Sequence, residues 1–250
     1  MGGTAVRTAT TALVTGANKG IGLQAVRQLA ELGLTVLLGS RDPDRGARAA
    51  AELAARGVRA EPVTLDVTDA GSVRAAAEHI DDRHGVLDVL VNNAGIFLGP
   101  LSLDTTAEDL RPLYETNVFG VVTVTRAMLP LLRRSRAPRV VNVSSTTASV
   151  ELTRRPEPIP GDPTRRLAYA SSKAALNMLT AQYAEAFERD PELARIKVNA
   201  VAPGFTATDL NGFTGTRTAA EGARVITRLA TLPDDGPSGG FFDDRGPLPW

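Results

Sequence analysis

The sequence of 250 residues contains no cysteine. Disulfide bonds, thiolate catalysis and cysteine-based metal sites are therefore excluded. Only two histidines are present, His79 and His84, and they lack the carboxylate spacing of a zinc motif such as H-E-x-x-H. We interpret them as solvated helix residues and predict no metal site. No apolar run approaches the length of a membrane span, and the first residues lack the apolar core of a secretion signal, so we expect a cytoplasmic protein with no membrane partner.

An excess of charge of either sign is also missing. The 28 basic and 28 acidic residues cancel, which gives no support for nucleic acid or an anionic membrane as a partner. Lysine occurs only at positions 19, 173 and 197, whereas arginine is abundant. Because arginine supplies the generic positive charge, Lys19 and Lys173 are candidates for positions that require a compact ammonium. The alternative is chance survival under a compositional bias.

Short apolar runs alternate along the chain with longer helical patterns. The runs are rich in Val and Leu and do not alternate with polar residues, which is typical of parallel strands covered on both faces. We predict strands at 12–15, 35–38, 60–65, 87–91, 139–143 and 197–201, a last strand at 241–242, and helices near 20–32, 44–56, 70–84, 105–134, 167–189 and 218–230. The fold class is thus α/β, with one Rossmann-type doubly wound parallel sheet of about seven strands and helices on both faces.

Residues that typically begin or end helices occur at the positions that this order of elements requires. Gly33, Gly57 and Gly85 each follow a helical stretch, where a left-handed residue ends a helix. Capping boxes are predicted at Thr105-x-x-Glu108 and Thr218-x-x-Glu221. We expect a single domain over residues 1–250. Two stretches depart from the alternation: an insertion rich in Pro and Arg at about 151–166, and a tail at about 233–250.

The first predicted strand leads directly into a glycine-rich turn and a helix. Such a turn lets backbone amides approach a pyrophosphate, and the helix N-terminus adds its positive end. The spacing is G-x-x-x-G-x-G, a weak signal alone, and an ordinary tight turn is the alternative. Its position at the start of an α/β domain favours nucleotide binding. The candidate residues are Gly16, Asn18, Lys19, Gly20, Ile21 and Gly22.

The end of the second strand, Ser40-Arg41-Asp42, bears on the choice between NAD and NADP. A carboxylate here suits the ribose 2′-hydroxyl of NAD, whereas an arginine suits a 2′-phosphate. Arg41 offers a planar fork for that phosphate, and Lys19 can approach the same group. We therefore favour NADP (NADPH). The alternative makes Asp42 the ribose ligand, but Asp42 precedes Pro43 and is also placed to cap the next helix.

Seven motifs in order now resemble those of the short-chain dehydrogenase/reductase family, over nearly the whole chain. They are Thr15–Gly22, Asp66-Val67, Asn92-Asn93-Ala94-Gly95, Asn117, Ser144-Ser145, Tyr169-x-x-x-Lys173 and Pro203-Gly204-Phe205-Thr206-x-Thr208. The chain is similar to the carbonyl reductase branch in Gly16–Gly22, Ser40–Asp42, Arg139–Ser145 and the tail from Gly239 to Trp250.

Tyr169 and Lys173 lie one helical turn apart and so project from one face. A phenol with a pKa of about 10 is a poor acid–base catalyst at neutral pH, and an adjacent ammonium lowers that pKa. The alternative is a surface pair on a helix. The resemblance implies that Ser145, rather than Ser144, is the catalytic serine, and that Asn117 holds a water linking Lys173 to solvent.

The resemblance also implies the remaining cofactor contacts. Asp66 would accept from the adenine amino group beside the Val67 backbone, although Asp66 is also placed to cap a helix with Thr68 and Asp69. Tyr169 and Lys173 would also contact the cofactor. The other residues implied are Asn93, Ala94 and Gly95 along the adenine-side ribose, Pro203, Gly204 and Thr206 at the nicotinamide amide, and Thr208.

The gap between Ser145 and Tyr169 is longer than in typical family members, and the extra residues fall in the insertion. The insertion lies next to a helix that such members use to assemble, so it either favours a monomer or forms a lid over the substrate. A plain solvated loop is the alternative. We expect a monomer or a small homo-oligomer.

We conclude that the sequence predicts NADPH-dependent reduction of a ketone or aldehyde by hydride transfer, with Tyr169 as the general acid. The alternatives are an NAD(P)-dependent alcohol dehydrogenase and a catalytically silent NADP-binding regulator. The partner is a small carbonyl substrate of unknown identity. Phe97, Leu98 and Phe213 suggest an apolar pocket lining, with core packing as their default explanation.

Overall fold

A computed structural model of the protein describes residues 10–97 and 99–250. Seven strands form one sheet in the order β3-β2-β1-β4-β5-β6-β7, and all neighbouring strands are parallel. This confirms the predicted fold class. The strands are β1 (Thr11–Val14), β2 (Thr35–Ser40), β3 (Glu61–Thr64), β4 (Val89–Asn92), β5 (Arg139–Val143), β6 (Lys197–Val201) and β7 (Phe241–Phe242).

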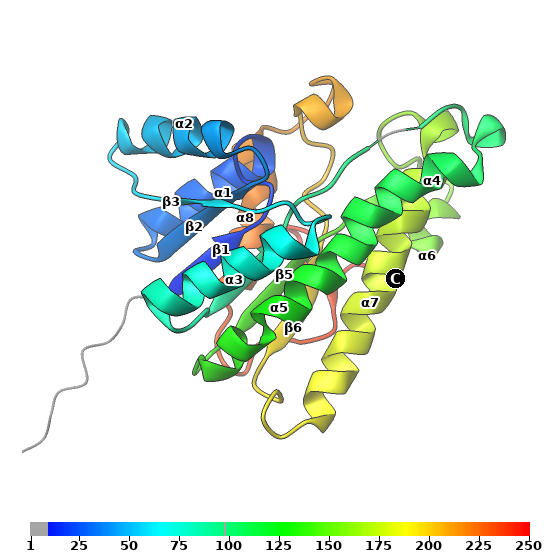
Figure 1. Ribbon diagram of the computed structural model, residues 1–250. Helices are drawn as coiled ribbons and strands as arrows, with labels where there is room; N and C mark the ends of the chain where they lie inside the picture. Colours follow the sequence, from blue (N-terminus) through cyan, green and yellow to red (C-terminus); the bar gives the residue numbers. More distant parts are fainter. Residues whose placement is uncertain (1–9, 98) are drawn as a thin grey trace, which may run out of the picture.

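Helices cover both faces of this sheet, as Figure 1 shows. One layer is made by α1, α2 and α8, and the other by α3, α5 and α7. The helices are α1 (Gly20–Glu31), α2 (Pro43–Ala54), α3 (Ala70–His84), α4 (Ala107–Tyr114), α5 (Gly120–Arg134), α6 (Val150–Thr153), α7 (Leu167–Arg189) and α8 (Ala219–Ala230). The outer helices cover β1, β4 and β5 from both sides, so every residue of these three strands is buried, whereas the edge strand β3 is partly exposed.

Successive residues of one strand enter opposite layers. In β1, Ala12 and Val14 pack in the cluster that contains α1 and α8, whereas Leu13 packs in the cluster that contains α3 and α5. Both clusters consist of residues that are almost entirely inaccessible to solvent. One apolar core therefore packs on each face of the sheet, and together the two cores fix the register of its strands.

The order of the strands places a ligand site at the carboxyl edge of the sheet. The chain runs outward from β1 to β3 and then returns to β4 on the other side of β1. Loops that follow β1 and β4 therefore diverge at this switch point and leave a crevice between them. Because all seven strands are parallel, the loops after β5 and β6 end at the same edge.

The predicted helix over 105–134 needs correction at its start. The capping residue is Thr106, which forms a reciprocal capping box with Asp109, and not Thr105 with Glu108. Thr105 instead donates its hydroxyl hydrogen bond to the Leu101 carbonyl at 3.2 Å, next to the short 3₁₀ turn η1 (Ser102–Asp104). The second threonine is thus the first residue free to cap the helix.

The same segment is also not one regular helix. A π-helical turn, η2 (Glu115–Phe119), separates α4 from α5. A π-helical turn contains one extra residue, which widens the helix locally. Such turns are frequent at functional sites. Asn117 lies in this turn, which accounts for an asparagine in a region whose pattern is otherwise helical.

The other predicted helix ends and the second predicted capping box are confirmed. Gly33, Gly57 and Gly85 have φ values of 88°, 79° and 67°, and Thr218 forms the predicted capping box with Glu221. The insertion contains α6 and the short 3₁₀ turn η4 (Pro163–Arg165). In residues 10–97 and 99–250, no helix combines the length and apolar character that spanning a bilayer requires.

Candidate active site

A cavity of about 1240 Å³ opens at the carboxyl edge of the sheet. It is lined by every predicted site residue except Asn117. The lining residues from that set are Gly16, Asn18, Lys19, Gly20, Ile21, Gly22, Arg41, Asp66, Val67, Asn93, Ala94, Gly95, Ser145, Tyr169, Lys173, Pro203, Gly204, Thr206 and Thr208. Residues from the loops after six strands and from the helices α1 and α7 are thus brought into one wall, as expected for this edge of a parallel sheet.

The glycine turn at the start of α1 is held by a neighbouring loop. Gly16 has a φ of 61°, and a Cβ atom there would lie 2.8 Å from the Ala94 Cα. A Cβ at Gly22 would lie 2.4 Å from the Asn93 Nδ2. That amide nitrogen donates to the Thr15 and Gly16 carbonyls at 2.9 and 3.1 Å. The turn therefore accepts only glycine at these two positions, and its backbone stays open toward the cavity.

This turn fits a dinucleotide. Its glycines leave the space beside α1 free of side chains, and the N-terminal amides of α1 face an anion with the favourable end of the helix dipole. The Thr15 hydroxyl accepts from the backbone amides of Asn93 and Ala94 at 3.0 and 2.9 Å, which joins the loops after β1 and β4. Sequence reasoning did not single out Thr15 for this, although a polar residue ending an apolar strand is a usable signal.

The candidate residues that follow β2 and β3 differ in what their side chains contact. Asp42 caps α2 by accepting from the Arg45 amide at 3.0 Å, as the sequence predicted, and it forms an ion pair with the Arg45 side chain. Asp66 accepts from the amide and the hydroxyl of Thr68, whereas the cap of α3 is Asp69. Arg41 is exposed and lines the cavity.

Lys19 was predicted to approach the 2′-phosphate of the cofactor, but in the structure its side chain contacts an acidic residue. Its ammonium forms an ion pair with Asp209, which begins the 3₁₀ turn η5 (Asp209–Asn211) after β6. The pair joins two walls of the same cavity across 190 residues of sequence. No local pattern in the sequence connects these two residues, and Asp209 was not among the predicted site residues.

Tyr169 and Lys173 lie on α7 in the cavity wall, where Lys173 is buried and Tyr169 is half-buried. The Tyr169 ring packs edge-on against the Phe97 ring, with centroids 5.2 Å apart. The Lys173 ammonium lies 5.8 Å from the centroid of the Tyr169 ring. It donates to the Val143 carbonyl at 2.8 Å, at the end of β5. The helix and the strand end together therefore fix the lysine beside the phenol.

The pKa values of these two groups move in opposite directions. Burial raises the pKa of Tyr169 to about 12, and a hydrogen bond with the Ser145 side chain opposes that rise. Burial lowers the pKa of Lys173 to about 8. The lowered phenol pKa that the sequence suggested is therefore not found, because removing the phenolate from water outweighs the stabilising contacts. At neutral pH Tyr169 is protonated.

Asn117 lies behind the cavity wall rather than in it. Its side chain is fully buried and holds the Ile96 backbone, because Oδ1 accepts from the Ile96 amide at 2.9 Å and Nδ2 donates to the Ile96 carbonyl at 3.1 Å. Nδ2 also donates to the Ser172 hydroxyl at 3.0 Å. A Cβ at Gly95 would lie 3.3 Å from both Asn117 Oδ1 and Lys173 Nζ, so these residues meet at Gly95.

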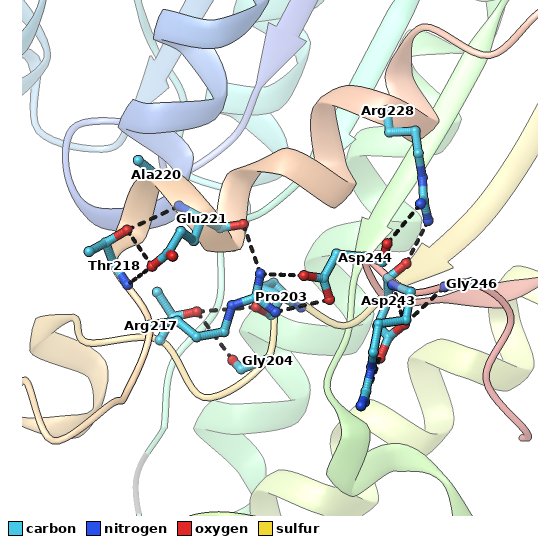
Figure 2. A network of polar contacts seen from close by, with 12 residues as sticks. Pro203, Gly204, Arg217, Thr218, Ala220, Glu221, Arg228, Asp243, Asp244 and Gly246 are labelled. Carbon is cyan, nitrogen blue, oxygen red and sulfur yellow. Dashed lines mark hydrogen bonds and ion pairs between the residues drawn. The ribbon is translucent and has the colours of Figure 1, made fainter.

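The segment after β6 is pinned by a network of charged residues (Figure 2). Arg217 donates to both carboxylate oxygens of Asp244, at 3.0 and 2.7 Å, and to the Glu221 carbonyl. Its side chain covers Gly204, where a Cβ would lie 2.9 Å from the Arg217 Cδ. Arg228 donates to the carbonyls of Asp243 and Asp244. The tail thereby supports the Pro203-Gly204 end of the cavity.

Part of the insertion belongs to the cavity wall. The Arg166 guanidinium gathers the carbonyls of residues 159, 160 and 161 by hydrogen bonds of 2.6, 3.0 and 2.7 Å. A Cβ at Gly161 would lie 3.3 Å from the Phe205 ring, so the insertion contacts the loop after β6. Residues 160–162, 165 and 166 line the cavity. This part of the insertion therefore borders the cavity, although residues 160–165 are exposed.

The apolar residues suggested for the substrate pocket separate in the structure. Phe97 lines the cavity, whereas Phe213 is 68 % exposed on the loop after β6, and Leu98 lies outside the described residues. Trp250 stacks on Phe241 with centroids 5.6 Å apart, and its carbonyl accepts from the Ser149 hydroxyl. Within residues 10–97 and 99–250, no group of three or more His, Asp or Glu side chains is arranged to hold a metal ion.

Comparison with known proteins agrees with this geometry. The sequence model of the short chain dehydrogenase family matches residues 10–219. The short-chain dehydrogenase anuI of Penicillium roqueforti is 37 % identical over 88 % of this chain and 87 % of its own. Carbonyl reductase [NADPH] 1 of Rattus norvegicus is 34 % identical over 96 % and 98 %. The crystal structure of NADPH-bound carbonyl reductase from chicken fatty liver has a TM-score of 0.83 and 30 % identity, and covers 98 % of this chain and 100 % of that one.

Proposed function

Because the chain belongs to the short-chain dehydrogenase/reductase family and is an oxidoreductase with carbonyl reductase-like relatives, we propose that it reduces a ketone or aldehyde to an alcohol with NADPH. The observation that carries this proposal is the half-buried Tyr169 phenol, which shares one cavity wall with the Ser145 side chain and the Lys173 ammonium. The single seven-stranded sheet supports the further proposal that residues 1–250 form one domain, with the insertion and the tail as additions to it.

The proposed binding mode uses the glycine turn for the pyrophosphate and Arg41 for the 2′-phosphate. Arg41 supports NADP over NAD because its planar guanidinium matches a phosphate, while the neighbouring carboxylate of Asp42 is used as a helix cap. Asp66 and Val67 lie at the proposed adenine end of the cavity, and Pro203, Gly204 and Thr206 at the proposed nicotinamide end. When bound, the dinucleotide supplies the hydride.

The protein's own groups act on the substrate oxygen. The Tyr169 hydroxyl is protonated at neutral pH because burial raises its pKa to about 12, which is the state that a proton donor requires. Ser145 and Tyr169 line the same cavity, so in this proposal their two hydroxyls hold one carbonyl oxygen between them as negative charge develops. The phenol then loses its proton to that oxygen, and the nearby ammonium of Lys173 stabilises the phenolate left behind.

Lys173 is also suited to return the proton. Burial lowers the pKa of Lys173 to about 8, close to the working pH, so it can both hold and release a proton. The proposed role of Asn117 is to support the path along which Lys173 returns a proton to Tyr169. Its side chain is committed to the Ile96 backbone and to Ser172, and its own backbone lies in a π-helical turn, where carbonyl groups are displaced from regular helical bonding.

Replacing Tyr169 with Phe tests the proposal. Tyr169→Phe keeps the ring that packs on Phe97 and removes only the hydroxyl, so we expect a loss of carbonyl reduction of about 10²- to 10⁴-fold with NADPH binding retained. The assay is NADPH consumption with a panel of ketones, aldehydes and quinones, and binding is followed by NADPH fluorescence. Reduction at a near wild-type rate with NADPH still bound would refute the role of Tyr169.

Tyr183→Phe is the matched control for this variant. Tyr183 also lies on α7, but its ring stacks on Phe187, 5.5 Å away between centroids, in the core beneath the sheet and not in the cavity wall. The same chemical change at Tyr183 is expected to leave the rate of reduction unchanged.

A further inference from the structure

Residues 207–216, which we name the cleft loop, leave the body of the protein after β6 and return to it before α8 (Figure 1). The loop is closed at its neck by backbone hydrogen bonds. The Ala207 amide donates to the Arg217 carbonyl at 2.8 Å, and the Thr216 amide donates to the Phe205 carbonyl at 2.9 Å. A loop with such a neck can change its position as a unit without disturbing the strand and helix that flank it.

The polar contacts of the cleft loop are otherwise internal or directed to its neck. Asn211 donates to the Thr206 carbonyl at 2.9 Å, Thr214 donates to the Asn211 carbonyl at 2.8 Å, and the Phe213 amide donates to the Thr208 carbonyl at 2.9 Å. Among the described residues, one polar contact joins the loop to the rest of the molecule beyond that neck, and it is the ion pair between Asp209 and Lys19.

The position of this ion pair is at the cofactor cleft. Lys19 immediately precedes α1 in the glycine turn, and both Lys19 and Asp209 line the cavity. The loop also touches the turn through apolar atoms, since a Cβ at Gly20 would lie 3.4 Å from the Thr208 Cγ2. The pair therefore connects the turn proposed to bind the pyrophosphate with the loop on the opposite wall.

Asp209 is a negatively charged residue in the wall of a cavity that is proposed to bind phosphate groups. A carboxylate beside a site for phosphate groups repels the ligand, so by itself Asp209 would weaken cofactor binding. The hydrogen bond from Lys19 holds the pKa of Asp209 below its usual range, so the carboxylate is ionised at neutral pH. An ionised acid is tolerated here if its pairing with Lys19 has a use that offsets this repulsion.

We propose that the Lys19–Asp209 ion pair is a strap that holds the cleft loop closed over the bound dinucleotide and sets the rate at which the cofactor leaves. This inference rests on the proposed function, because it requires the cavity to bind NADPH. Asp209 is a positioning residue in this scheme and touches no reacting atom. Since product and cofactor release limit turnover in many enzymes with closing loops, the strap is a control point for the overall rate.

The test is the dissociation rate of NADPH and of NADP⁺, measured by stopped-flow fluorescence on the full chain. Asp209→Asn removes the charge that Lys19 binds, so we expect dissociation to become about two- to five-fold faster, the size that an exposed ion pair provides. Asp209→Glu keeps the charge and is expected to stay close to wild type. Electrostatic repulsion alone predicts the opposite sign, with tighter binding and slower release after Asp209→Asn.

A second background isolates the pair from any contact that Lys19 makes with the cofactor. In a Lys19→Gln chain, Asp209→Asn is expected to have no further effect on dissociation, because its partner is already absent. Added salt should speed dissociation more in the wild type than in the Asp209→Asn chain, where only the phosphate contacts are left to be screened. Asp81→Asn, which breaks the exposed pair with Arg134 on α3 and α5, is the control and should not alter release.

The results separate the strap from the proposed function. Faster release in Asp209→Asn that disappears in the Lys19→Gln background supports the strap. Unchanged or slower release in Asp209→Asn, with NADPH still bound, overturns the strap and leaves the reductase proposal standing. A wild-type chain that binds neither NADPH nor NADP⁺ overturns both.

Discussion

Lys173 and Lys19 line the same cavity, yet Lys173 is 4 % exposed, whereas the side chain of Lys19 is 56 % exposed. The first is fixed by a backbone carbonyl at the end of β5, and the second by a carboxylate on a loop. Burial shifts the pKa of Lys173 to about 8, which the proposed proton transfer needs. The exposed rim of the cavity is instead built from weak, screened ion pairs, which suit binding and release.

The difference shows how one cavity can combine chemistry with exchange of ligands. Groups that must keep a fixed geometry lie on α7 and at the end of β5, where two apolar cores immobilise the backbone. Groups that must let a cofactor enter and leave lie on loops whose contacts cost little to break. We therefore expect substitutions in the buried part to change the rate of the reaction, and substitutions at the rim to change affinity or release.

The largest effect is expected from Lys173. Lys173→Met removes the ammonium that stabilises the phenolate, so carbonyl reduction should fall by about 10²-fold or more at saturating NADPH. In the wild type, the rate should decline as the pH rises through about 8, because Lys173 then loses its proton. The raised pKa of Tyr169 predicts no earlier decline from the phenol. The measurement is kcat between pH 6 and 10.

Two outcomes would contradict this assignment. One is a wild-type rate that stays level from pH 7 to 10, and the other is a Lys173→Met chain that keeps the same declining limb as the wild type. Either result would mean that the titrating group is not Lys173, and that the contrast between the buried and exposed lysines does not carry over to function.

A smaller effect is expected at the exposed rim from Arg41. Arg41→Ala removes the proposed 2′-phosphate contact, so the affinity for NADPH should fall by about 10- to 100-fold, as for a charge-assisted hydrogen bond. The affinity for NADH should stay the same, and kcat at saturating NADPH should change little. Both affinities are measured by fluorescence titration.

Asp42→Ala is the control for this change. Asp42 caps α2, so its loss should lower the melting temperature without altering the preference for NADPH. If instead Asp42→Ala weakens NADH binding while Arg41→Ala has no effect, then Asp42 is the ribose ligand and the protein prefers NAD.

The smallest effect is expected from an ion-pair cluster far from the cavity. Glu61 on β3 contacts His79, Arg83 and His84 on α3. Although burial opposes it, these partners hold the pKa of Glu61 below its usual range. The ionised carboxylate therefore stabilises the fold above the ordinary pKa, and this contribution disappears as the pH falls through the lowered one. Glu61→Gln should lower the free energy of unfolding at pH 7 by about 0.5 to 1 kcal/mol.

Urea unfolding at pH 7 and at pH 3 checks this prediction, with kcat measured alongside. The difference between variant and wild type should be smaller at pH 3 than at pH 7, and kcat should not change at either pH. A changed kcat in Glu61→Gln would show that exposed charges affect catalysis wherever they lie, and would weaken the distinction between the rim of the cavity and the remaining surface.

Much of the fold was predictable because it depends on local patterns. Short apolar runs rich in Val and Leu identified six of the strands and the Phe241-Phe242 pair the seventh, and β5 and β6 begin and end at the predicted residues. The start of α4 was predicted two residues early, because Thr105 and Thr106 are both good caps and only the contact of Thr105 with Leu101 decides between them. The π-helical turn at Asn117 was not predicted, and the hydrogen bonds that Asn117 makes there reach Ile96, 21 residues earlier, so no local pattern records them.

By itself, the sequence determined the α/β class, the glycine turn, the pairing of Tyr169 with Lys173 on one helical face, and the grouping of the candidate residues at one edge of the sheet. These follow from spacing within a few residues and from the rule that loops after parallel strands meet at one edge. Only the tertiary structure decided the raised pKa of Tyr169, the commitment of Asn117 to Ile96, and the pairs Lys19–Asp209 and Arg217–Asp244. Burial and contacts between distant segments exist only once the chain has packed, so no local pattern records them.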